Sequence, residues 1–246
     1  MHPQGFRRPI GFGSTLTSTG KIMLIVYAAV YILELIGEQW LGLQLYGLLA
    51  LSPPKSGFFH YWQLITHPVI HPPGSPIGFL IDCLVFYFFA GTVEAALGTR
   101  RFLRLYILAA VGAAAAGLIF GALTPPGLPF AGMMPSLLAL IVVFGLLNPE
   151  ATVLFMFVLP IKAKYISYGT VIVTALTFLA RTNVHGAYHL GGIALAWLYF
   201  RSPTQWLDTD WWRWKYFEYT QKKRRSRFTV IDGGSEDNKD NKPTIH

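Results

Sequence analysis

Charged side chains are scarce in this chain of 246 residues, since Asp, Glu, Lys and Arg together make up 13% of it. Apolar residues make up 53%, and the mean hydropathy is positive. This balance excludes an ordinary soluble domain and predicts an all-α polytopic membrane protein. The single cysteine, Cys83, excludes an intrachain disulfide.

Patterns that bind metals, cofactors or nucleic acid are also missing. The histidines have no acidic or Cys partners at ligand spacing, so no metal site is predicted. No strand is predicted, and therefore no strand leads into a glycine-rich phosphate loop, so no cofactor is expected. The net charge of +8 comes from basic residues beside apolar segments, so membrane topology explains it without a nucleic-acid partner.

Long apolar stretches dominate what is present. A helix that crosses a bilayer needs ~20 apolar residues, and stretches of about this length cover residues 22–37, 77–97, 102–123, 165–180 and 186–200, with a shorter one at 136–147. No cleavage site follows the first stretch, so it is predicted to be a retained span. We therefore expect a cytosolic tail at 1–20, a six-helix membrane domain at 21–201 and a second cytosolic tail at 202–246.

The basic residues predict the orientation, because Lys and Arg accumulate in cytoplasmic loops. They precede the first span, lie between the second and third, precede the fifth, and recur in the tail at residues 222–227. Both termini are therefore predicted to be cytosolic, and a bacterial cytoplasmic membrane is the expected location. Aromatic residues at 206–219 run into the basic cluster, which predicts an interfacial segment against anionic lipid headgroups.

The short stretch at 136–147 follows residues 125–132, which are too rich in Pro and Gly for a regular helix. Non-helical backbone at membrane depth must be buried in protein or line a wet cavity. We expect an outward-opening cavity, with Ser136 at the start of a helix that begins below the surface. His189 in the last span and Asp82 in the second are expected at a similar depth, and ionisable groups within spans mark functional sites.

Several motifs occur in an order typical of one family. They are Trp62-Gln63-Leu64-Ile65-Thr66 before the second span, Phe88-Phe89-Ala90 through Glu94 to Gly98, the glycine-led loop into the short fourth span, Leu159-Pro160-Ile161-Lys162 before the fifth, and His189-Leu190-Gly191-Gly192 in the sixth. Over residues 20–201 the chain resembles the rhomboid family of intramembrane serine proteases and their inactive relatives. The resemblance implies a six-helix rhomboid-like bundle.

The resemblance also implies a Ser–His dyad, whose serine the family carries in a Gly-x-Ser-Gly motif. Counting from Gly132 places Met134 in the nucleophile position, whereas the available hydroxyl belongs to Ser136, which lies 53 positions before His189. We assign Ser136 as nucleophile and His189 as general base, with Gly132 and Asp82 supporting the oxyanion.

The oxyanion side departs from the family, which carries His and Asn at the positions of Gly78 and Asp82. Asp82 would donate to an oxyanion only if protonated, or it would orient His189. His71, before the second span, would supply a cation near the outer mouth.

The function expected from this resemblance is that of an intramembrane serine protease, which hydrolyses peptide bonds in or near transmembrane segments of its substrates. The alternative is an inactive pseudoprotease that binds transmembrane segments of client proteins.

Overall fold

The computed structural model describes residues 16–125, 127–155, 159–181 and 184–201. Most of the predicted N-terminal tail and the whole predicted C-terminal tail lie outside these residues. The predicted domain boundaries and the predicted interfacial segment therefore stay predictions.

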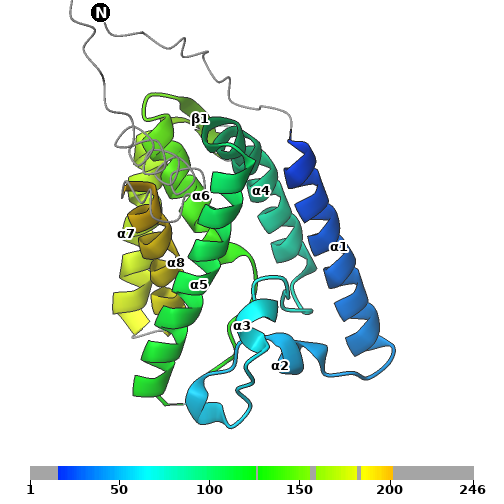
Figure 1. Ribbon diagram of the computed structural model, residues 1–246. Coiled ribbons are helices and arrows are strands. Elements are labelled where there is room, and N and C mark those ends of the chain that lie inside the picture. The colour runs from blue at the N-terminus through cyan, green and yellow to red at the C-terminus, as the bar shows by residue number, and fades with distance from the viewer. Residues whose placement is uncertain (1–15, 126, 156–158, 182–183, 202–246) are drawn as a thin grey trace, which may run out of the picture. The chain divides into compact units, whose positions relative to one another are not determined.

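Six helices of 14 to 25 residues dominate the described part of the chain (Figure 1). They are α1 (Ser18–Gln39), α4 (Pro76–Leu97), α5 (Thr99–Leu123), α6 (Met134–Leu147), α7 (Ala163–Arg181) and α8 (Val184–Arg201). Of the helices described, α1, α4, α5 and α7 are long and apolar enough to cross a membrane. The all-α polytopic fold class predicted from composition is confirmed.

A small hairpin between α6 and α7 was not expected. Strands β1 (Thr152–Phe155) and β2 (Leu159–Lys162) pair antiparallel, with Val153 opposite Ile161. The prediction that the chain has no strand is therefore wrong, because four-residue strands are too short for an alternating pattern to stand out beside long apolar helices. We call the end of the bundle with β1 and β2 the hairpin end.

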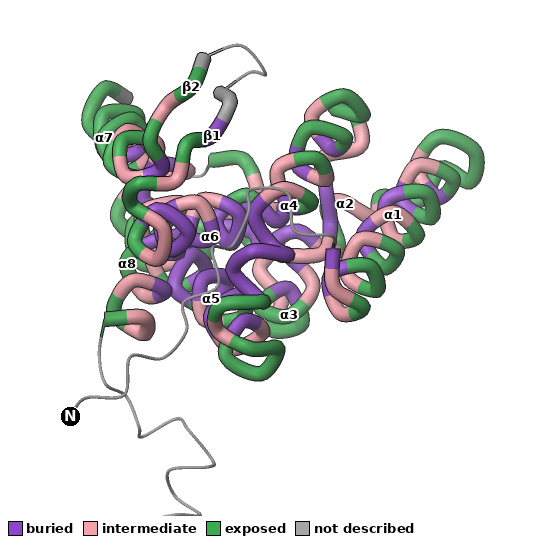
Figure 2. The backbone as a smooth tube through the Cα atoms, turned by 90° about the horizontal axis from the view of Figure 1, so that it is seen from above, coloured by how far each residue is buried: buried purple, intermediate pink, exposed green. Residues whose placement is uncertain are grey.

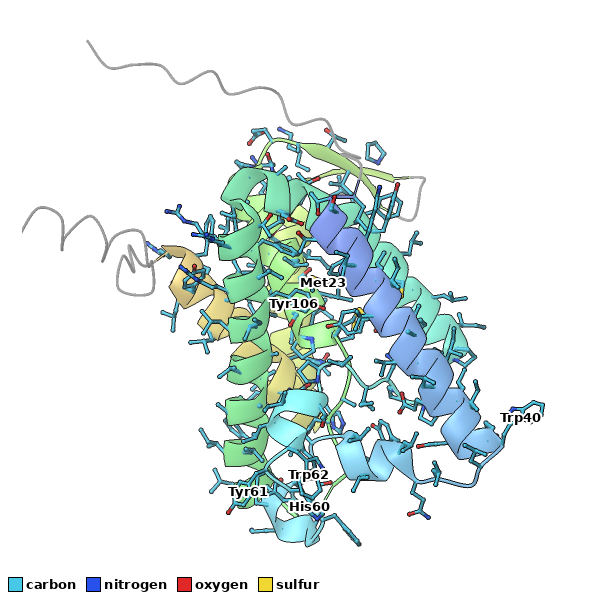
Figure 3. All side chains as sticks on the ribbon, turned by 45° about the vertical axis from the view of Figure 1, so that its right-hand side comes forward. Met23, Trp40, His60, Tyr61, Trp62 and Tyr106 are labelled. Atoms are coloured by element: carbon cyan, nitrogen blue, oxygen red, sulfur yellow. The ribbon has the colours of Figure 1, made fainter. Side chains whose placement is uncertain are left out.

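The opposite end, which we call the loop end, carries the long connection between α1 and α4 (Figure 1). This connection contains α2 (Leu45–Leu49), the 3-10 turn η1 (Pro54–Ser56) and α3 (Gln63–Thr66). Several of its apolar side chains are exposed, including Trp40, Tyr61 and Ile65 at 84%, 83% and 80%. Figure 3 shows Trp40 pointing away from the bundle beyond α1, and Tyr61 and Trp62 at the loop end. This exposure fits the interfacial burial expected of apolar side chains at a membrane surface.

Helix α6 lies at the centre of the bundle, in contact with α4, α5, α7 and α8 (Figure 2). Its side chains are apolar almost all round, which is typical of a helix buried on every side. With 14 residues it is ~21 Å long against a hydrocarbon core of ~30 Å, and Pro135 and Ser136 in its first turn are buried in the bundle. It begins at Met134, however, and not at Ser136.

The closest helix pair is α5 with α8, and glycines make this approach possible. A Cβ on Gly112 would collide with the carbonyl oxygen of Gly191, and a Cβ on Gly191 would collide with Ala116. Small residues that let backbones touch are the usual means of packing helices within membranes. The contact fixes the position of α8 against α5, and therefore that of His189.

Helix α1 lies at the edge of the bundle, with an exposed apolar face that includes Ile25 and Leu33 (Figure 2). Polar side chains tie its inner face to the bundle at three levels. The Thr17 hydroxyl donates to Glu94, the hydroxyls of Tyr27 and Tyr106 share a hydrogen bond of 3.0 Å, and Glu34 accepts from the loop before α4.

Candidate functional site

Gln63 binds the backbone of the connection between α1 and α4. Its side chain is fully buried, and its Oε1 accepts from the backbone N–H groups of Ser52 and His60, both at 3.1 Å. Its Nε2 donates to the carbonyl oxygens of Leu48 and Phe58 at 3.2 and 3.1 Å. All four contacts are to backbone, so this one amide holds the connection between α1 and α4 in shape.

His67 links that connection to the loop before α6. It is fully buried, its Nδ1 lies 2.9 Å from the carbonyl oxygen of Gln63, and its ring packs edge-on against Tyr188. Its own carbonyl oxygen accepts from the backbone N–H of Gly132 at 2.9 Å. Burial lowers the pKa of His67, which favours the neutral imidazole.

Gly132 makes the turn that leads into α6. Its φ of +97° is a conformation that side chains disfavour, which explains the glycine at this position. An oxyanion hole needs donors free to meet the developing charge. The N–H of Gly132 is already donated to His67, so this geometry does not support the oxyanion role assigned to Gly132.

Ser136 lies in the first turn of α6 and faces α5. Its side chain is 1% exposed, and its Oγ donates to the carbonyl oxygen of Tyr106 at 3.0 Å. Tyr106, labelled in Figure 3, is itself buried in the bundle. The hydroxyl proton, which a general base would have to remove, is therefore held by the backbone of a neighbouring helix.

His189 lies on the side of α8 that faces α6. It shares a helical face with Gly192, where a Cβ would lie 2.8 Å from the Cβ of Pro135 in α6. The two predicted dyad residues thus belong to adjoining helices. Among the residues that the structure describes, no hydrogen bond joins Ser136 to His189, and the ring of Tyr188 lies beside that of His189, with centroids 5.6 Å apart.

Asp82 faces a histidine, but that histidine is His71. The carboxyl Oδ2 of Asp82 lies 3.7 Å from Nδ1 of His71, and both side chains are buried. Burial lowers the pKa of His71, which works against the outer cation that the sequence suggested. The structure thus brings Asp82 together with His71 and not with His189.

Glu34 completes this cluster and was missed by the sequence reasoning. Its Oε2 accepts from the backbone N–H of His71 at 3.2 Å, and its Oε1 is buried without a hydrogen-bond partner in the described part of the chain. An acid in the middle of an apolar 22-residue helix was the available signal, because ionisable groups inside spans need partners. Two carboxyls and one imidazole, from α1, α4 and the loop between them, thus lie in one buried polar cluster.

Two pockets open at the loop end, with volumes of about 260 and 750 Å³. The smaller is lined by Phe130 and His185, and neither pocket has Ser136 or His189 in its lining. Phe130 is 1% exposed and stacks on Tyr188 with ring centroids 5.1 Å apart. The segment before α6 is non-helical, as predicted. Its residue Phe130, however, is buried in protein and pairs through its backbone with Leu51.

No group of three or more His, Cys, Asp or Glu is arranged to hold a metal ion within residues 16–125, 127–155, 159–181 and 184–201. The Asp82–His71–Glu34 cluster has one imidazole and two carboxyls, and Glu34 is turned toward a backbone N–H.

The sequence of the membrane domain also matches a known family. The model of a family described as "Eukaryotic integral membrane protein (DUF1751)" matches residues 21–204. The chain belongs to this family. No curated protein matches the chain. Membership makes the chain an integral membrane protein of a eukaryotic family, so the expected bacterial cytoplasmic membrane has no support.

Proposed function

We propose that this chain is a rhomboid-like membrane protein that binds transmembrane segments of client proteins without cleaving them. The observation that carries this proposal is the buried Ser136 hydroxyl, which donates to the Tyr106 carbonyl. A serine nucleophile must instead give its proton to a general base in line with the substrate. The same conclusion is supported by the backbone N–H of Gly132, which already donates to His67, and by the pairing of Asp82 with His71.

Proteolysis is the second candidate, and one observation favours it. Ser136 and His189 lie on adjoining helices, with α6 and α8 in contact beside Pro135 and Gly192. Rotation of the serine side chain would be required to release its hydroxyl from α5. An enzyme of this kind would hydrolyse peptide bonds in transmembrane substrates through Ser136 and His189.

The orientation of the proposed binding protein follows from its basic residues. Lys21 at the start of α1, Arg100 and Arg101 at the start of α5, and Arg201 at the end of α8 belong to the hairpin end. Because Lys and Arg accumulate on the cytosolic side, this supports a cytosolic hairpin end and cytosolic termini in a eukaryotic membrane.

One experiment separates the two functions. The purified full chain in liposomes is given a fluorescent transmembrane-segment peptide, and cleavage, peptide binding by energy transfer, and labelling by a fluorophosphonate are measured together. We expect saturable binding with intact peptide and no labelling. Ser136→Ala is expected to change none of these readouts.

Ser167→Ala is the matched control, because Ser167 is also a buried serine that donates to backbone carbonyls, those of Ile141 and Val142. Cleavage and labelling that disappear in Ser136→Ala and His189→Ala but persist in Ser167→Ala would establish the protease. A folded protein that neither binds nor cleaves the peptide would reject both functions.

A further inference from the structure

An apolar groove of about 500 Å³ opens on the outside of the bundle between α7 and α8, with α6 as its floor. Its walls are formed mainly by branched and aromatic side chains, among them Leu146, Ile172, Ile193 and Trp197. Ser167 also lines it, but its hydroxyl donates to the backbone of α6 at 3.0 and 3.2 Å. The groove therefore offers hydrocarbon contacts and no free hydroxyl from Ser167.

Cations lie at the hairpin end of this groove. The Arg201 guanidinium lies over the ring of Trp197, 5.1 Å from its centroid, and Trp197 itself lines the groove. On α7, Lys164 lies one turn before Tyr168, another lining residue, and therefore on the same helical face.

Glu150 is an acidic side chain at this end, and it accepts from Lys162 at 2.8 Å and also from Lys164. Lys162, Lys164 and Arg201 carry three positive charges against the one negative charge of Glu150, so these four described residues have a net charge of +2. An apolar groove below an aromatic ring and a cationic rim is complementary to a lipid with an anionic headgroup.

We infer that the groove binds one anionic phospholipid, with its anionic headgroup at Arg201 and an acyl chain along α7 and α8. A transmembrane helix fits this groove less well, because helix docking favours small residues and side chains free to hydrogen bond. Here the walls are bulky and the Ser167 hydroxyl is occupied. The groove is separate from Ser136 and His189, neither of which lines it.

Trp197 provides a local test. The full chain is reconstituted in liposomes that contain brominated phosphatidylserine or, at equal mole fraction, brominated phosphatidylcholine, and quenching of tryptophan fluorescence is recorded. Subtracting the signal of Trp197→Phe isolates the contribution of Trp197 and removes that of tryptophans elsewhere, including the C-terminal tail. We expect roughly fivefold stronger apparent binding of phosphatidylserine, the fold-change that corresponds to ~1 kcal/mol for one cation near a membrane surface.

Two variants probe the two parts of the site. Arg201→Gln is expected to abolish the preference for phosphatidylserine, and Ala194→Phe, which fills the groove from an exposed lining position, is expected to reduce quenching by both lipids. Lys21→Gln, at the start of α1, and Leu198→Phe, which does not line the groove, are the controls and should behave as the unaltered chain.

Equal quenching by the two lipids would overturn the inference and make the groove an ordinary lipid-facing surface. Absence of Trp197-dependent quenching in the folded protein would also overturn it, because protein and not lipid would then cover the groove. A preference that survives Arg201→Gln but is lost in Lys21→Gln would assign the headgroup contact to another part of the chain.

Discussion

Alanine at Gly112 is expected to destabilise the bundle, because it separates α5 from α8. The new Cβ would collide with the carbonyl oxygen of Gly191 and lie 2.6 Å from the Cβ of Leu195. Neither neighbour is the far end of a flexible side chain, so the helices themselves must move. Overpacking of this kind destabilises by ~1–3 kcal/mol.

The helix propensity of alanine opposes this effect, since alanine is more favourable than glycine within a helix by ~1 kcal/mol. Gly169→Ala measures this term alone, because Gly169 lies within α7 and a Cβ there would meet nothing within 4 Å. Relative to Gly169→Ala, Gly112→Ala should therefore unfold ~1–3 kcal/mol more easily. Titration with SDS in mixed micelles, followed by circular dichroism, measures the difference. Equal midpoints for the two variants would refute the close approach of α5 and α8.

Three further outcomes are expected from the same titration. Tyr27→Phe removes the hydrogen bond to Tyr106 and should cost ~1 kcal/mol, with no further loss when Tyr106→Phe is added. Glu34→Leu leaves the buried backbone N–H of His71 unpaired and should lower the free energy of unfolding by ~1–3 kcal/mol. Glu34→Gln keeps an acceptor and should lower it less, so equal losses of stability in the two variants would contradict the contact. Burial lowers the pKa of His67 and His71 below the ordinary 6.5, so the unfolded chain binds more protons. The contribution of these two histidines to stability should therefore fall as the pH drops from neutral to about 5, and an SDS midpoint whose pH dependence is unchanged when both His67→Gln and His71→Gln are introduced would be inconsistent with this burial.

The positions of the long helices were predictable from the sequence. Each of them coincides with a run of apolar residues. Such a run favours a bilayer because of its own composition, whatever the rest of the chain contacts. The short α6 was also predictable. It is a run of apolar residues, and the Pro and Gly residues before it exclude a longer helix. The β1–β2 hairpin was not, because its pairing depends on contacts between two very short segments.

The sequence also identified Ser136, His189, Asp82 and Gly132 as the residues to examine, but it did not determine what each one contacts. Successive residues of a helix differ by about 100° in direction, so a small change in packing decides whether a hydroxyl meets an imidazole or a backbone carbonyl. Ser136 meets the carbonyl of Tyr106, which is 30 residues away in the chain.

The partner of Asp82 was likewise decided by tertiary structure. His71 and Glu34 reach the same place from a loop and from α1, and the Glu34–His71 contact joins residues 37 positions apart. Composition thus determined that this chain is a bundle of membrane helices, because burial of apolar surface depends on how many apolar residues each segment carries. Only the tertiary structure decided which polar groups meet inside the bundle, because a hydrogen bond depends on the direction and distance of two atoms brought together by the whole fold.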